Sequence, residues 1–148
     1  MKVVDANLLL YAVDEASPHH EIAKPWLEQR LSGSETFAFA WAVLLAFVRL
    51  GTNPRVFETP LTLEEAFDLV DSWLEQPCAT VVHPSDRHNQ LLRELLAPFG
   101  TAGNLTSDAH LAALSVEHGA ELCSADADFA RFPRVRWVNP LVPTGSGG

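Results

Sequence analysis

The chain has few positive charges and almost no lysine. Its 148 residues include 10 lysines and arginines against 19 aspartates and glutamates, a net charge of −9, and Lys2 and Lys24 are the only lysines. Proteins that bind nucleic acid over a broad surface usually carry basic patches, so the composition argues against that mode of binding. It does not exclude a nuclease, because acids in a site can bind a metal that meets the phosphate. A surface of this charge also suits a basic protein partner.

Cysteine and long apolar runs are scarce too. Cys78 and Cys123 are the only cysteines, and the longest apolar stretch without a charge, residues 36–48, is too short to span a bilayer. Asp5 interrupts what would be the hydrophobic segment of a signal peptide. We therefore expect a cytoplasmic protein with reduced thiols and no association with a membrane.

Several common catalytic patterns are missing as well. The histidines show no metal-ligand spacing such as HExxH, and there is no glycine-rich phosphate loop. No Ser-His-Asp arrangement can be argued from spacing. Arg131, Arg134 and Arg136 form a small basic group before the last apolar segment; such a group is more often solvated surface than a phosphate contact.

Short apolar segments alternate with segments at helical spacing along the whole chain. Strands are expected near residues 3–4, 37–40, 79–82, 122–124 and 135–138. Helices are expected from residue 7, from a Ser17 cap to Leu31, over 41–50 as a mostly buried helix, from a Thr62–Glu65 capping box, from a Ser85 cap, and over 104–119. This alternation predicts an α/β fold, a three-layer α/β/α sandwich with a central, mainly parallel sheet. We expect a single domain over residues 1–142 and a flexible tail over 143–148.

Four aspartates stand at the junctions of these segments. Asp5 follows the first strand, Asp108 opens a helical segment, and Asp126 and Asp128 follow the strand at 122–124. The carboxyl ends of strands in an open α/β sheet share one edge, where ligands bind. Carboxylates gathered there repel one another, and a hard divalent cation such as Mg²⁺ or Mn²⁺ removes that repulsion. We therefore predict a shared metal site.

Two of the aspartates, taken alone, have a simpler explanation. Asp108 could cap its helix and Asp128 a short turn, whereas Asp5 is harder to explain because an uncompensated charge after an apolar strand is costly. Haloacid-dehalogenase-like phosphatases also place an aspartate after strand one, but they need Asp-x-Asp, and this chain has Asp5-Ala6-Asn7. Those enzymes and receiver domains normally use a later lysine too, and the only lysines here, Lys2 and Lys24, weaken both interpretations.

Three segments together resemble the PIN-domain family, specifically the VapC toxins of bacterial toxin–antitoxin pairs. They are Val4-Asp5-Ala6-Asn7-Leu8-Leu9, the segment from Asn104 to Leu114, and Ser124-Ala125-Asp126-Ala127-Asp128-Phe129. The segments at residues 44–49 and 52–55 resemble a mycobacterial-type subgroup. The resemblance covers residues 1 to about 142, and the order and spacing of its motifs are specific.

The resemblance implies a Mg²⁺- or Mn²⁺-dependent endoribonuclease held inactive by a cognate VapB antitoxin. It implies Asp5, Asp108 and Asp126 as the metal ligands, with Asp128 as a further catalytic residue. Asp5 and Asp108 would hold the principal ion, and Ser124 is expected to hydrogen-bond a carboxylate. The family usually has a glutamate in the helix after strand two, where this chain has Ala46.

Two functions therefore stay open at this point. The retained aspartates favour a ribonuclease, whereas Ala46 favours a PIN-like module that has lost catalysis and acts through a protein partner. Large apolar residues on the helices at 22–31 and 41–50, among them Trp26, Trp41 and Phe47, predict a homodimer, an antitoxin groove, or both.

Overall fold

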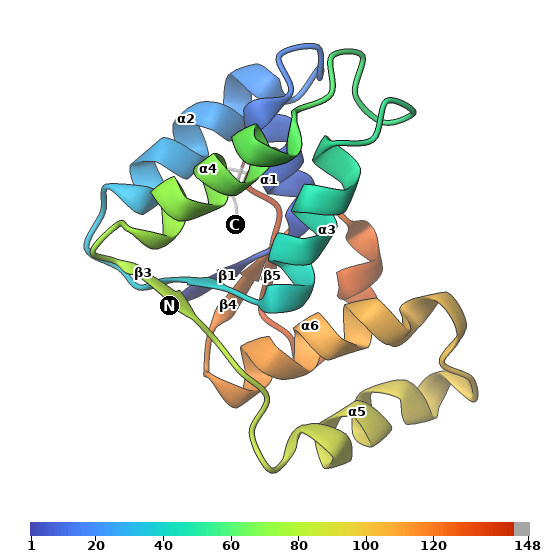
Figure 1. The fold of residues 1–148 in the computed structure, drawn as a ribbon. Coiled ribbons are helices and arrows are strands. Elements are labelled where there is room, and N and C mark those ends of the chain that lie inside the picture. The colour runs from blue at the N-terminus through green and yellow to red at the C-terminus, as the bar shows by residue number, and fades with distance from the viewer. Residues whose placement is uncertain (144–148) are drawn as a thin grey trace.

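Five short strands form one parallel sheet in the computed structural model, which describes residues 1–143 (Figure 1). The strands are β1 (Lys2–Val4), β2 (Phe37–Phe39), β3 (Ala79–Val81), β4 (Glu121–Cys123) and β5 (Trp137–Val138), and their order in the sheet is β3-β2-β1-β4-β5. All four pairings are parallel. The predicted α/β class is confirmed, and the sheet within these residues is wholly parallel.

Helices cover both faces of this sheet. They are α1 (Ala6–Val13), α2 (His20–Leu31), α3 (Trp41–Gly51), α4 (Leu63–Leu74), α5 (His88–Leu96) and α6 (Thr106–Glu117). Short 3-10 turns lie between α5 and α6, η1 (Ala97–Phe99) and η2 (Gly103–Leu105), and between β4 and β5, η3 (Ala127–Arg131). In Figure 1, α1, α2 and α4 lie on one side of the sheet and α5 and α6 on the other, which confirms the predicted three layers.

Aromatic packing fixes α3 and α4 against the sheet. The Trp73 ring of α4 stacks on Phe39 of β2, with ring centroids 6.1 Å apart, and meets the edge of Phe47 on α3 at 4.7 Å. Phe39 and Phe47 are fully buried. Buried aromatic pairs contribute beyond the area that they remove from water, by about 0.5–1.5 kcal/mol each. Because Phe47 points inward, the opposite side of α3 is left for other contacts.

The starts of the helices test the capping predictions. The Thr62–Glu65 capping box is present, with Thr62 Oγ1 accepting from the Glu65 amide at 3.1 Å and Glu65 accepting from the Thr62 amide at 3.0 Å. The caps predicted at Ser17 and Ser85 are wrong, because α2 and α5 begin three residues later. Each serine hydroxyl instead accepts from the amide two residues on, at 3.1 Å, and so closes a turn before the helix.

A chain of side chains holds α5 against α6. His88 lies between Glu117 and His110: its Nδ1 is 2.9 Å from Glu117 Oε1, and its Nε2 is 2.9 Å from His110 Nδ1. Ser85 Oγ also donates to Glu117 Oε1 at 3.0 Å, and the Glu117 side chain is only 2% exposed. This link stabilises the pair of helices to which Asp108 belongs.

The segment predicted as a flexible tail, residues 143–148, falls almost wholly outside the described residues, which end at Pro143. The domain limits and the cytoplasmic location stay predictions. Within residues 1–143, no helix combines the length and apolarity that crossing a bilayer requires.

Candidate active site

The carboxyl edge of the sheet brings together residues from three distant parts of the chain. Asp5 follows β1, Asp126 follows β4 by three residues, and Asp108 is the third residue of α6. Because β1 pairs directly with β4, with Val4 opposite Cys123, the segments that leave these two strands lie side by side. The parallel pairing therefore places Asp5 next to the Ser124–Asp126 turn.

Asp5 is held by a dense set of hydrogen bonds. Its Oδ1 accepts from the Ala6 amide at 2.8 Å, as the N-cap of α1, and its Oδ2 accepts from the Ser124 hydroxyl at 2.7 Å and from Asn7 Nδ2 at 3.3 Å. The Ser124 hydroxyl also accepts from the Asp126 amide at 3.0 Å and from Asn7 Nδ2 at 3.1 Å. The expected bond from Ser124 to a carboxylate is thus present, and it connects the turn after β4 to the end of β1.

Asn7 is a site residue that the sequence reasoning did not single out. Its amide nitrogen donates to Asp5 and Ser124, and its Oδ1 accepts from the Ala125 amide at 3.2 Å. Its place two residues after Asp5, on the first turn of α1, was the available clue, because that spacing lets a side chain reach back to the same strand end. Asn7 orients the Asp5 carboxylate against the β4 turn.

The carboxylates of Asp108, Asp126 and Asp128 come closest to one another. Each offers an oxygen within 4.8 Å of the other two. Asp108 and Asp126 are half-buried, and Asp128 is exposed. Asp126 also accepts from the Asp128 amide at 2.9 Å and caps η3. The structure therefore groups Asp128 with Asp108 and Asp126, and places Asp5 beside this group rather than within it.

Burial and mutual repulsion disfavour the charged forms of two of these acids. The pKa of Asp108 is raised to about 6, first because burial removes the carboxylate from water and then because Asp126, Asp5 and Asp128 are nearby. Burial also raises the pKa of Asp5, while the bonds from Ser124 and Ala6 lower it and Asp126 raises it further. Within residues 1–143 no hydrogen bond to the Asp108 side chain is present, so it does not act as a helix cap.

A cleft beside Asp5 and Asp108 opens toward α3. It has a volume of about 180 Å³, and Ala42, Ala46 and Arg49 of α3 line it. Asp5 and Asp108 line it as well, together with Ala6, Val43, Ser107 and Leu111. Ala46 thus faces the same cleft as the two acids, so the helix register taken from the family resemblance agrees with the structure. Below we call this space the Asp5–Asp108 cleft.

The small group of arginines before β5 does not form a free basic patch. The Arg131 guanidinium lies over the Phe99 ring, 4.8 Å from its centroid, and Arg134 pairs with Glu94 at 2.7 Å. Arg136 donates to the Gly119 carbonyl. Because all three have partners within the protein, the interpretation as ordinary surface is favoured for this group.

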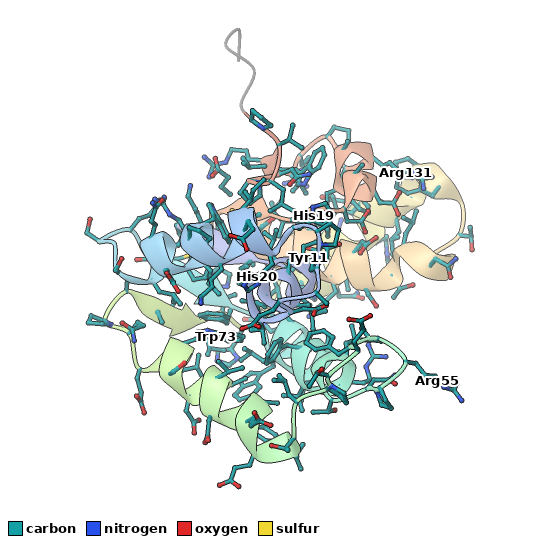
Figure 2. All side chains as sticks on the ribbon, turned by 90° about the horizontal axis from the view of Figure 1, so that it is seen from above. Tyr11, His19, His20, Arg55, Trp73 and Arg131 are labelled. Carbon is teal, nitrogen blue, oxygen red and sulfur yellow. The ribbon has the colours of Figure 1, made fainter. Side chains whose placement is uncertain are left out.

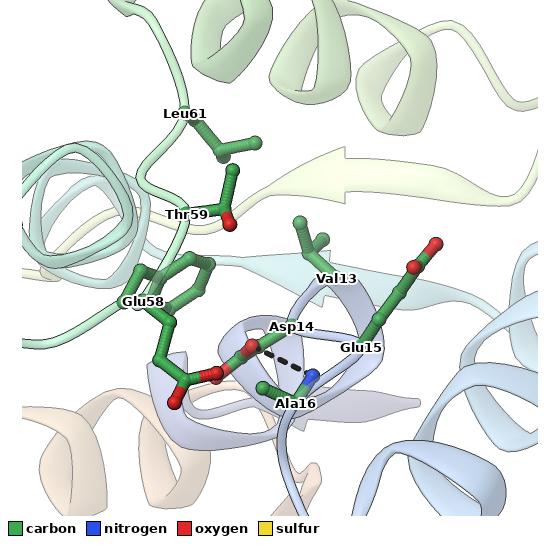
Figure 3. A pocket seen from close by; sticks show the side chains of 8 residues that line it. Val13, Asp14, Glu15, Ala16, Glu58, Thr59 and Leu61 are labelled. Atoms are coloured by element: carbon green, nitrogen blue, oxygen red, sulfur yellow. Dashed lines mark hydrogen bonds between the residues drawn. The ribbon is translucent and has the colours of Figure 1, made fainter.

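A larger cavity lies at the opposite end of α1 from Asp5. Its volume is about 300 Å³, and Val13, Asp14, Glu15, Glu58 and Leu61 are among its lining residues (Figure 3). Asp14 is engaged there in a turn, accepting from the Ala16 amide at 3.0 Å. None of the four predicted site aspartates lines this cavity, so the smaller Asp5–Asp108 cleft remains the candidate site.

Fold and site together define a three-layer α/β protein with a carboxylate cluster at the end of a parallel sheet. Carboxylate oxygens are the donors that Mg²⁺ and Mn²⁺ prefer, so the residues present fit such an ion. A sequence model of the PIN domain matches residues 2–135. The chain belongs to the PIN-domain family.

Curated relatives match nearly the whole chain. The protein named "Ribonuclease VapC37" from Mycobacterium tuberculosis is 51% identical over 140 residues, which cover 95% of this chain and 97% of that protein. "Ribonuclease VapC33" from the same species is 38% identical over 141 residues, which cover 95% of this chain and 99% of that protein. These similarities confirm the resemblance to VapC proteins of the mycobacterial type.

Solved structures confirm the fold. The M. tuberculosis VapC20 crystal structure, described as a sarcin-ricin-loop-cleaving toxin, has a TM-score of 0.68 at 16% identity and covers 92% of this chain and 98% of that one. The VapBC2 complex of Rickettsia felis, bound to a promoter DNA fragment, has a TM-score of 0.67 at 21% identity and covers 93% and 97%. At these identities the similarity concerns the fold alone.

Proposed function

We propose that the chain is a VapC-type toxin, an endoribonuclease that hydrolyses RNA phosphodiester bonds with Mg²⁺ or Mn²⁺. The observation that carries the proposal is the convergence of Asp5, Asp108, Asp126 and Asp128 on the carboxyl edge of the sheet. The ribonuclease names of relatives that match over nearly the full length support it.

In this proposal Asp108 and Asp126 hold the cation, together with Asp5 from the side of β1 and with Asp128 as the further acid of the group. When bound, a divalent ion lowers the pKa of a water and polarises a phosphoryl oxygen. The protein's own part is to position the carboxylates. Ser124 and Asn7 fix the rotamer of Asp5, and the bond between Asp126 and the Asp128 amide holds the turn after β4.

We also propose an antitoxin of the VapB type as partner, and self-association as a homodimer. Four large apolar side chains on α3 and α4 support a protein partner: Trp41 is 49% exposed, Leu45 60%, Leu63 61% and Phe67 46%. The expectation that α3 is mostly buried is therefore wrong for Trp41 and Leu45, whereas Phe47 is fully buried. Unpaired apolar side chains of this size are typical of interaction surfaces. The net charge of −9 favours a basic partner.

The decisive experiment incubates the pure protein with total RNA in Mn²⁺ and, separately, in EDTA. Asp108→Asn serves as the site variant, and Asp68→Asn, an exposed acid on α4 with no ion pair within residues 1–143, serves as the matched control. We expect cleavage in Mn²⁺ by the wild type and by Asp68→Asn only. Equal cleavage by Asp108→Asn would show that the cleavage does not depend on the proposed site and would refute the proposal.

The second candidate function is a PIN-like binding module without catalysis, and the alanine at position 46 is the observation that favours it. A protein that binds an antitoxin but leaves RNA intact in both Mn²⁺ and Mg²⁺ would establish this alternative. We favour the enzyme because all four aspartates are retained, and because Mg²⁺ accepts water in place of a protein ligand.

A further inference from the structure

One side of the Asp5–Asp108 cleft carries no carboxylate. Ala42, Ala46 and Arg49 line it from α3, and their spacing of four and three residues places them on a single helical face. The opposite side carries Asp5 and Asp108. The cleft is therefore divided into an acidic side, suited to a cation, and an α3 side, where small apolar side chains, Val43 among them, lie beside one guanidinium.

Arg49 is the only positively charged residue among those that line the cleft. Its side chain is exposed, and no ion pair or side-chain hydrogen bond within residues 1–143 engages it. Arg131, Arg134 and Arg136 differ from it in this respect, because each has a partner inside the protein. The guanidinium of Arg49 is thus available to a ligand that enters the cleft.

We infer that Arg49 binds a backbone phosphate of the RNA, next to the phosphate that is cleaved, and so positions the strand along the carboxylate-free face of α3. The inference rests on the proposed ribonuclease function and adds a substrate-binding residue to it. A guanidinium presents paired donors that match phosphate oxygens. The small side chains of Ala42 and Ala46 leave room for the backbone to approach.

The charge of the molecule favours such a contact. A polyanion that approaches a protein of net charge −9 is repelled unless cations are present where it binds. A metal held by the aspartates would neutralise the scissile phosphate, but Arg49 is the only cation on the cleft lining that could meet a neighbouring phosphate. A glutamate at position 46 would place a negative charge one turn before Arg49, in the path proposed for the RNA.

The test compares Arg49→Ala, Arg49→Lys and Arg55→Ala with the wild type. Arg55 is an exposed arginine in the loop after α3, does not line the cleft, and extends away from the body of the molecule (Figure 2). Arg55→Ala removes one positive charge, as Arg49→Ala does, and therefore serves as the matched control. The probe is a fluorescein-labelled single-stranded RNA, whose binding is measured by anisotropy at low salt in EDTA, where the metal-dependent reaction does not proceed.

We expect Arg49→Ala to weaken RNA binding about tenfold, the loss of one charged hydrogen-bonded contact, and Arg49→Lys to restore part of it. The slope of log affinity against log salt should fall by about 0.7 for one phosphate contact with a single strand. In Mn²⁺ the KM for cleavage should rise by a similar factor with kcat unchanged, because the contact is made equally before and during the reaction. Arg55→Ala should match the wild type.

Calorimetry with Mn²⁺ alone separates this role from a structural one. Arg49→Ala should bind Mn²⁺ at least as tightly as the wild type, since it removes a positive charge near the carboxylates. If the variant only lowers the melting temperature, with RNA affinity and KM unchanged, Arg49 serves the C-terminus of α3 and the inference is overturned.

The two proposals fail in different ways. Absence of RNA binding by the wild type at low salt, or equal affinities for the wild type and Arg49→Ala, would also overturn the inference. Failure of the wild type to cleave RNA, combined with weaker binding by Arg49→Ala, would refute the ribonuclease and leave Arg49 as an RNA-binding residue.

Discussion

Replacing Asp108 with asparagine should stabilise the protein in the absence of metal. The Asp108 carboxyl is half-buried and close to three other acids, and its pKa is raised to about 6. Since the pKa of an aspartate in an unfolded chain is about 3.9, folding at pH 7 confines a charge that the unfolded chain solvates freely. Asparagine has nearly the same shape and no charge. Within residues 1–143 no hydrogen bond to Asp108 would be lost.

The size of the effect follows from the pKa difference. Each pKa unit corresponds to about 1.4 kcal/mol, so the full difference would be about 3 kcal/mol for a completely buried group. Solvent screens the charge of a half-buried carboxylate, which reduces the expected gain in the free energy of unfolding to about 1–2 kcal/mol. That gain is large enough to be resolved by urea denaturation.

The pH dependence gives the stronger test. A carboxyl whose pKa is raised by folding destabilises the native state above that pKa, and this penalty disappears as the pH falls through about 6 toward the unfolded value. The advantage of Asp108→Asn over the wild type should therefore be full at pH 7.5, smaller near pH 6 and absent at pH 4. Urea titrations in EDTA at these three values measure it, with Asp68→Asn as the exposed control, which should stay within about 0.5 kcal/mol of the wild type.

In saturating Mn²⁺ the wild type should become more stable than Asp108→Asn. At a Mn²⁺ concentration 100 times the dissociation constant, a site that binds only when folded adds about 2.7 kcal/mol, and Asp108→Asn should lose most of that gain. Our reasoning would be refuted by a variant that is less stable than the wild type in EDTA at pH 7.5. An advantage that is independent of pH, or an equal Mn²⁺ effect in both proteins, would refute it as well.

Three further predictions concern the hydroxyl that holds Asp5, position 46 on α3, and the histidine pair between α5 and α6. Ser124→Ala removes the hydroxyl that donates to Asp5 at 2.7 Å. We expect the free energy of unfolding to fall by about 1–3 kcal/mol and Mn²⁺ to bind more weakly. An unchanged Mn²⁺ affinity would show that the hydroxyl does not position the carboxylate. Ala46→Glu should tighten Mn²⁺ binding in calorimetry and destabilise the protein in EDTA, whereas equal destabilisation with and without metal would place position 46 in the core. Burial and the neighbouring His88 lower the pKa of His110, so the free energy of unfolding falls as the pH drops below about 6.5, where the unfolded histidine binds a proton that the folded one does not. Protection factors for amide exchange in α5, which are corrected for the intrinsic pH dependence of exchange, should fall between pH 7 and 5, and His110→Gln should show a smaller fall.

Local patterns in the sequence were sufficient to predict the order of the elements and the chemistry at their ends. The Thr62–Glu65 box forms because its four residues interact within a single helical turn. The strand ends at Asp5 and before Asp126 follow from short apolar runs, and parallel strands share one carboxyl edge in any order. The sequence alone thus determined that acids would gather at that edge, and the register of α3 that turns Ala46 toward it agreed with the family resemblance.

Tertiary structure alone decided which side chains meet. Alternating strands and helices are compatible with many strand orders, and only the order that pairs β1 with β4 places Ser124 against Asp5 and Asn7. Asp128 joins Asp108 because the turn after β4 folds toward α6, a contact between segments about 20 residues apart in the chain. The partner of an exposed arginine likewise depends on which distant residue the fold brings near. Arg134 meets Glu94, whereas Arg49 lines an acidic cleft and has no ion pair within residues 1–143. Such pairings arise from packing between elements, so no local pattern of residues specifies them.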